Sequence, residues 1–181
     1  MSPKTRATIA DLYKVEGKAE LVNGEIVCMP PTGDAPNIAG GEIFASLREY
    51  ARRTQRGRAY TDNAGFRVHL LHRESFSPDV AYYVGPRTGM RFLEGALIFA
   101  VEIRSEHDYG PAAEASLTQK RADYFAAGTL VVWDVDLLSP EVVKVYRTSD
   151  PNTPTIYRRG EMAEAEPAVP GWRIPVDEIF G

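Results

Sequence analysis

Two acidic residues, Asp79 and Glu102, lie in otherwise apolar segments that are typical of buried β-strands. Glu102 interrupts ALIFAVEI, a run that is apolar on both faces, and Asp79 follows Pro78 at the start of DVAYYV. An ionised carboxylate is costly to bury, so each must be paired, hydrogen-bonded, protonated or metal-bound. Two carboxylates on neighbouring strands suit Mg²⁺ or Mn²⁺. The peptide carbonyl of Ile103 could complete one face of the ligand shell.

The chemistry expected of such a site is metal-dependent phosphodiester hydrolysis. A divalent cation polarises a phosphoryl oxygen, lowers the pKa of bound water and stabilises the leaving oxygen. Lys120, on the helix that follows, is placed to reach back over the strand ends, where its ammonium would orient the water or stabilise the transition state. Glu20, at the start of the first hairpin, is a further acidic group that could hold a water or a second cation.

Each of these residues also has a structural interpretation. Asp79 could cap a turn, and Lys120 could be a solvated helix lysine. Glu102 could form a buried salt bridge, for which the sequence offers Arg104, Lys120 and Arg121. The ordered combination of Asp, strand Glu and helix Lys is less expected by chance than any of its members.

Arginines recur on the long helix predicted after the first hairpin. Arg48, Arg52 and Arg56 are four residues apart and therefore form one stripe, which could neutralise successive phosphates of a nucleic acid. The alternative is a solvated helix face with Glu49 nearby. The net charge of −4 gives no global attraction to a polyanion, so a nucleic-acid interpretation rests on such local patches.

The histidines and the cysteine favour no site of their own. His69 and His72 have no third ligand at metal spacing and are interpreted as surface or hairpin-end residues, and His107 as a loop residue. Cys28 lies in the apolar run IVCM and is interpreted as a small core residue. A single cysteine forms no internal disulfide, which suits a reducing cytoplasm.

The length of 181 residues fits one domain, and 44% hydrophobic residues can supply a full core. We expect a protein without a membrane span, since no stretch approaches the roughly 18 apolar residues that a span requires and the N-terminus lacks a signal-peptide core.

The elements that must position these residues follow from periodicity and turn signals. Asn23-Gly24 predicts a type I′ β-hairpin within AELVNGEIV, and Thr8 can cap a short helix with Asp11 in a near capping box. Helical spacing predicts a long helix from Ile38 to near Gly57. The remaining predictions are strands at 58–61, 66–71, 80–84, 96–103, 129–135 and 141–147, a helix at 112–127 and a short apolar helix at 176–180.

The succession of strand, helix and strand from ALIFAVEI to TLVVWDV implies a right-handed crossover and at least one parallel pair. We therefore predict an α/β fold: a mixed sheet with antiparallel hairpins leading in and parallel strands at its centre.

Several segments in order carry a resemblance that spans Thr8 to Phe180. They are ELVNGEI, MPPTG, SPD, FAVEIRS, KRADYFAAGT and VVWDV, with a closing PGW and DEIF. The chain resembles the Uma-two (Uma2) family of restriction-endonuclease-like proteins, in the PD-(D/E)xK nuclease superfamily. The resemblance implies a restriction-endonuclease-like domain over residues 1–181, with a mixed sheet core flanked by helices. It also implies that the chain is a Mg²⁺- or Mn²⁺-dependent DNA endonuclease.

By the same resemblance, Asp79 and Glu102 are the metal ligands, Lys120 is the catalytic lysine moved onto the helix, and Glu20 is the acidic residue of the N-terminal element. A homodimer is compatible with this, since cutting both strands of a duplex is most simply done with two sites.

Two positions depart from the family's pattern. Arg104 occupies the usual strand-lysine position and is expected to bind phosphate or pair with a carboxylate. Asn37 stands where a histidine commonly opens the long helix. These departures leave open a catalytically degenerate binding or regulatory module, and a third interpretation is a structural homodimer with salt-bridged carboxylates.

Overall fold

The computed structural model describes residues 5–181, and the first four residues of the chain lie outside that range. Its main sheet has six strands in the order β11-β10-β9-β8-β6-β3. These strands are β3 (Arg58–Tyr60), β6 (Val80–Tyr83), β8 (Phe99–Ile103), β9 (Val131–Val135), β10 (Val143–Arg147) and β11 (Asp150–Tyr157). The helices are α1 (Ile9–Leu12), α2 (Asp34–Thr54), α3 (Pro111–Ala127) and a closing 3-10 turn, η1 (Val176–Phe180).

Three small sheets surround the main one. They are the hairpin β1 (Ala19–Val22) and β2 (Glu25–Cys28), the three-stranded group β4 (Phe66–Arg67), β5 (Ser75–Phe76) and β7 (Leu93–Glu94), and the pair β12 (Met162–Glu164) and β13 (Arg173–Pro175). The α/β fold with a mixed sheet and an N-terminal hairpin is confirmed. In the described residues, 5–181, no helix is both long and apolar enough to cross a membrane.

The centre of the main sheet is the parallel pair β8 and β9, joined by α3. The predicted parallel pair, with a helix between its two strands, is therefore confirmed. All other strand pairs of this sheet are antiparallel. The hairpin turn is confirmed as well, because Asn23 and Gly24 both adopt positive φ, at 54° and 72°. Thr8 and Asp11 form the capping box of α1.

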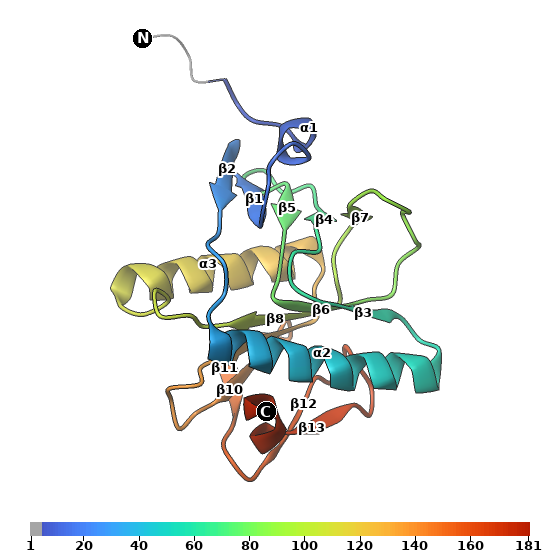
Figure 1. Cartoon of the computed structure of the whole chain (residues 1–181), viewed down its shortest axis with the longest axis vertical. Coiled ribbons are helices and arrows are strands. Elements are labelled where there is room, and N and C mark those ends of the chain that lie inside the picture. Colours follow the sequence, from blue (N-terminus) through green and yellow to red (C-terminus); the bar gives the residue numbers. More distant parts are fainter. Residues whose placement is uncertain (1–4) are drawn as a thin grey trace.

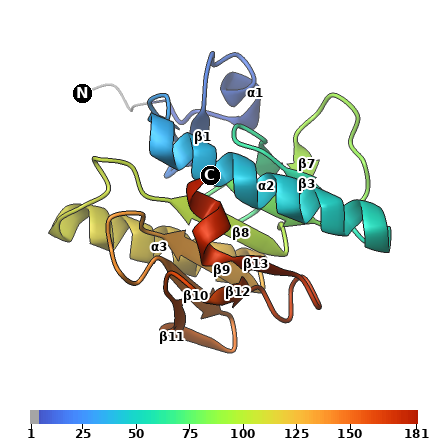
Figure 2. The ribbon, with the colours of Figure 1, turned by 60° about the horizontal axis from the view of Figure 1, so that its bottom comes forward.

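The sheet separates two layers, with α2 and η1 against one face and α3 against the other (Figures 1 and 2). Side chains of a strand alternate between faces. On β6, Val80 and Tyr82 join the core beneath α2, whereas Ala81 and Tyr83 join the core on the side of α3. The same alternation on β8 directs Glu102 towards α3.

Helix α2 begins four residues before the predicted Ile38 and ends at Thr54, three before the predicted Gly57. Gln55 ends it with a left-handed residue, at φ 54°. Gly57 then adopts φ 69° and passes so close to Tyr82 that a Cβ there would lie 2.6 Å from the ring. This tight connection returns the chain as β3, which contacts α2.

Some expectations were wrong in detail. The strand predicted at 66–71 is only two residues long, and β5, β7, β11, β12 and β13 were not predicted. Cys28 is exposed rather than a core residue, because β2 is the outer strand of its hairpin and leaves three of its four residues exposed.

Candidate active site

Asp79 and Glu102 lie opposite one another at the end of two neighbouring strands. β6 and β8 pair antiparallel with Val80 opposite Val101. One further step of this register brings Asp79 opposite Glu102, and the Asp79 amide bonds the Val101 carbonyl at 3.2 Å. Asp79 Oδ2 also accepts a 2.7 Å hydrogen bond from the Ile103 amide. The two carboxylates therefore share one face of the sheet.

Lys120 lies over this pair from helix α3. Its ammonium nitrogen is 2.9 Å from Glu102 Oε1 and 2.9 Å from Glu20 Oε1. Tyr124, one helical turn further along α3, donates a 2.5 Å hydrogen bond to Glu102 Oε1. The structure thus brings together Asp79, Glu102, Lys120 and Glu20. Of the salt-bridge partners that the sequence offered for Glu102, it is Lys120 that binds this carboxylate.

Glu20 is fixed by its own set of partners. Arg73 donates to Glu20 Oε2 at 2.6 Å, and the Ser77 amide donates to Oε1 at 2.8 Å. Both oxygens are therefore occupied by protein donors, and Glu20 acts here as the group that holds Lys120. Arg73 also donates a hydrogen bond to Asp123, which accepts another from Gln119 and contacts His72. This ion-pair network fixes the position of Glu20.

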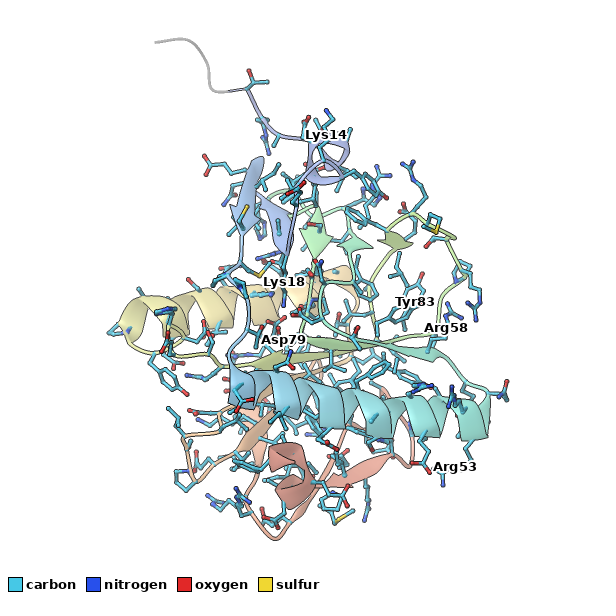
Figure 3. All side chains as sticks on the ribbon, viewed as in Figure 1. Lys14, Lys18, Arg53, Arg58, Asp79 and Tyr83 are labelled. Carbon is cyan, nitrogen blue, oxygen red and sulfur yellow. The ribbon has the colours of Figure 1, made fainter. Side chains whose placement is uncertain are left out.

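Lys18 completes the site and was not predicted from the sequence. Its ammonium lies 2.6 Å from Asp79 Oδ1 and 2.6 Å from Asp62 Oδ1. Figure 3 shows Lys18 and Asp79 next to one another. Lys18 precedes Glu20 by two residues, and side chains two apart on a strand share a face. That spacing was the available signal. Tyr124 is fully buried in the core and also donates a hydrogen bond to Glu102.

Burial and mutual charge set the protonation of the site. Burial raises the pKa of Glu102, and the nearby carboxylates of Asp79 and Glu20 add to this against the opposing effect of Lys120. Burial opposes the charge of Lys120, but Glu102 and Glu20 outweigh it and raise the pKa of the ammonium. For Lys18 likewise, Asp79 and Glu102 outweigh burial and raise the pKa. Both lysines are thus cationic donors near neutral pH.

The donor set fits a small hard cation held partly by water. Asp79, Glu102, Ile103 and Lys120 line one hollow of about 500 Å³. Within residues 5–181, no three His, Cys, Asp or Glu side chains converge on one point as a metal cage. Mg²⁺ usually keeps several waters and uses one or two carboxylates plus substrate phosphate. Asp79 and Glu102, with the Ile103 carbonyl, are the groups that could hold such a cation, which would have to displace Lys18 from Oδ1 of Asp79 or bind at Oε2 of Glu102, since Lys120 and Tyr124 occupy Oε1.

Arg104 lines the same hollow, but its guanidinium is paired with carboxylates. It donates to both oxygens of Asp134, at 2.8 and 2.7 Å, and also binds Glu114. Of the two expectations for Arg104, the structure shows the carboxylate pair; contact with nucleic acid stays a prediction.

The stripe predicted for Arg48, Arg52 and Arg56 is only partly helical, because α2 ends at Thr54 and Arg56 lies beyond it. His107 is an exposed loop residue at the rim of the hollow, and Asn37 lines the neighbouring hollow beside Asp79.

Comparisons with known proteins show the family and the fold. The family model of Uma2, described as "Putative restriction endonuclease", matches residues 8–177. The fold is similar to a crystal structure described as a putative nuclease belonging to DUF820 from Anabaena variabilis, with a TM-score of 0.74 and 16% identity over 96% of this chain and 97% of the other. No curated protein matches. The chain therefore belongs to the Uma2 family of nuclease-like proteins, described as putative restriction endonucleases.

Proposed function

We propose that this protein is a Mg²⁺- or Mn²⁺-dependent endonuclease that hydrolyses phosphodiester bonds in DNA. The observation that carries the proposal is the position of Asp79 opposite Glu102, with the Lys120 ammonium 2.9 Å from Glu102. Asp79 and Glu102 would hold the cation, together with the Ile103 carbonyl. A cation bound there would supply Lewis-acid polarisation of the phosphate and of a bound water.

The roles of the protein's own residues follow from their charge states. The raised pKa of Lys120 keeps it an ammonium, so it donates hydrogen bonds and stabilises developing negative charge rather than accepting a proton. Glu20 and Tyr124 position Lys120 and Glu102 respectively. Arg104 is no candidate for a base, because its hydrogen bonds to Asp134 and Glu114 keep its pKa raised.

The test is cleavage of plasmid and of a labelled duplex with Mg²⁺ or Mn²⁺. Asp79→Asn and Glu102→Gln keep side-chain size, and each should lower the rate at least about a hundredfold, or about 2.7 kcal/mol of transition-state stabilisation. Asp150→Asn, which changes an exposed carboxylate at the far edge of the sheet, should cleave normally. Intact cleavage by folded Asp79→Asn or Glu102→Gln would refute the mechanism.

A second candidate function is a nuclease fold that serves as a binding or regulatory module. It is favoured by the pairing of Lys18 with Asp79, since that carboxylate already has a cation. Calorimetric titration with Mn²⁺ separates the two functions: an endonuclease binds Mn²⁺ in a manner abolished by Asp79→Asn, whereas a degenerate module shows no such binding. A homodimer, with one site for each strand of a duplex, stays a prediction that sedimentation can test.

A further inference from the structure

Helix α2 and strand β3 form the walls of a groove that starts at Asp79. At one end, Gly40 and Gly41 of α2 and Thr61, the residue directly after β3, line a hollow of about 230 Å³ together with Asp79. At the other end, Phe44, Arg48 and Arg52 of α2 and Tyr60 of β3 line a second hollow of about 520 Å³. The lining residues succeed one another along both elements, so the two hollows lie end to end.

The α2 wall is a single helical stripe. Its members recur at intervals of three and four residues, which places them on one side of a helix: Asn37, Gly40, Gly41, Phe44, Arg48, Ala51, Arg52 and Gln55. The acidic residues Glu42 and Glu49 of the same helix line neither hollow. The helix therefore presents cations without carboxylates to the far hollow.

We call the far hollow the arginine groove, defined by Arg48, Arg52, Arg58 and Arg87. Among residues 5–181, its lining includes no Asp or Glu, and Arg48, Arg52 and Arg87 are exposed and form no ion pair. Arg58 is held in place by Gly85 and Tyr60, at 2.6 and 2.9 Å, which are both uncharged partners. Within the part of the chain that the structure describes, these four cations thus have no carboxylate partner, although the chain carries a net charge of −4.

A second observation at the near end also points to a ligand. Gly41 lies within α2, where glycine disfavours the helix, yet a Cβ there would meet nothing within 4 Å. Packing within the protein therefore does not require glycine at this position. A bare helix surface beside Asp79 allows the backbone of a ligand to approach closely.

We propose that the α2–β3 groove binds the sugar-phosphate backbone of one DNA strand, which runs from Asp79 to the arginine groove. The helix rise of 1.5 Å per residue separates Gly40 from Arg52 by about 18 Å, which is about five nucleotide steps at the 3.4 Å rise of a B-form strand. Figure 3 shows Asp79 and Arg58 on the same side of α2, near its two ends, whereas Arg53 points to the other side. The position of the scissile phosphate at Asp79 rests on the proposed function. The binding of DNA in the groove does not.

The test is the affinity for a fluorescein-labelled DNA duplex, measured by anisotropy in EDTA over a range of salt concentrations. Arg48→Ala/Arg52→Ala should weaken binding at least tenfold and lower the salt slope by about 1.8, since each phosphate contact contributes about 0.9. Arg56, the third member of the predicted stripe, lies beyond the end of α2 and lines neither hollow, and Arg53 also lines neither. Arg53→Ala/Arg56→Ala therefore removes the same charge from outside the groove and should change affinity less than twofold. Gly41→Val should weaken binding although it removes no charge.

Equal weakening by the two arginine pairs, or none by Arg48→Ala/Arg52→Ala, would overturn the inference. Because binding is measured without divalent metal, the outcome is separate from that of the proposed function. A protein that binds through Arg48 and Arg52 but never cleaves would keep this inference and lose the endonuclease. Normal binding and normal cleavage by Arg48→Ala/Arg52→Ala would refute this inference and leave the proposed endonuclease in place.

Discussion

The ammonium nitrogen of Lys18 lies 2.6 Å from Oδ1 of Asp79. This lysine neutralises a carboxylate that is proposed to bind a divalent cation, so the two cations compete for one ligand. Lys18→Met should therefore tighten the binding of Mn²⁺ about tenfold, equivalent to about 1.4 kcal/mol. Isothermal titration with Mn²⁺ measures this directly.

Lys14→Met is the matched control for that variant. Lys14 is exposed and pairs with Asp11 of helix α1. It lies away from Asp79 (Figure 3). Its loss should leave Mn²⁺ affinity unchanged. If Lys18→Met bound Mn²⁺ no better than the wild type, the lysine would not compete with the cation.

Lys120 is expected to stabilise the fold as well as the reaction. It is the shared partner of Glu20 and Glu102, which are both nearly buried. Lys120→Met leaves Glu102 without an ammonium, and removal of one member of a buried ion pair costs about 3–5 kcal/mol. Urea unfolding at pH 7 should show a loss of that order. Lys144→Met breaks a surface pair with Glu141 and should cost less than about 1 kcal/mol; equal losses for both variants would contradict the shared-partner role.

Replacement of Gly41 by alanine is expected to stabilise the protein. Gly41→Ala places its methyl group in open space and removes a glycine from a helix interior, so the free energy of unfolding should rise by about 0.5–1 kcal/mol. Thermal unfolding can detect this gain. Gly57→Ala should do the reverse, because Gly57 adopts φ 69° and its new Cβ would lie 2.6 Å from Tyr82. A loss of stability in Gly41→Ala would mean that the position serves packing after all.

The sequence led to the grouping of Asp79, Glu102 and Lys120 because a charged residue is conspicuous in a segment that is otherwise apolar. Glu102 stood out within an apolar strand, and Lys120 stood out on the helix that connects β8 to β9. Lys18 did not stand out, since its contact with Asp79 depends on how the first hairpin packs against the main sheet. That packing is tertiary: the two-residue spacing between Lys18 and Glu20 predicts a shared face, but it does not predict the contact with Asp79.

The missed strands have similarly physical causes. β5 and β7 are two residues long, too short for an alternating pattern. β11 contains Pro151 and Pro154, which argue against a strand, but it is the edge of the sheet, where proline is tolerated. Arg104 pairs with Asp134 on β9. The sequence left open whether Arg104 binds a phosphate or a carboxylate, because the answer depends on the register between β8 and β9, which the sequence does not give.

Asp123 gives a prediction about acid stability. This buried residue accepts hydrogen bonds from Arg73 and Gln119, and although burial opposes its charge, these partners lower its pKa below the ordinary 3.8. A lowered pKa in the folded state stabilises the protein above pH 3.8, and this stabilisation disappears as the pH falls through the folded-state pKa.

Asp123→Asn should therefore lower the free energy of unfolding by about 3 kcal/mol at pH 7, since it removes one partner of the buried pair with Arg73. Below the folded-state pKa, Asp123 is protonated in the wild type too, so the difference between the two proteins should shrink. Urea unfolding at pH 7, 5 and 3 measures that difference, with Asp150→Asn as an exposed control. A difference that stayed constant down to pH 3 would show that the Asp123 charge does not stabilise the network beneath Glu20.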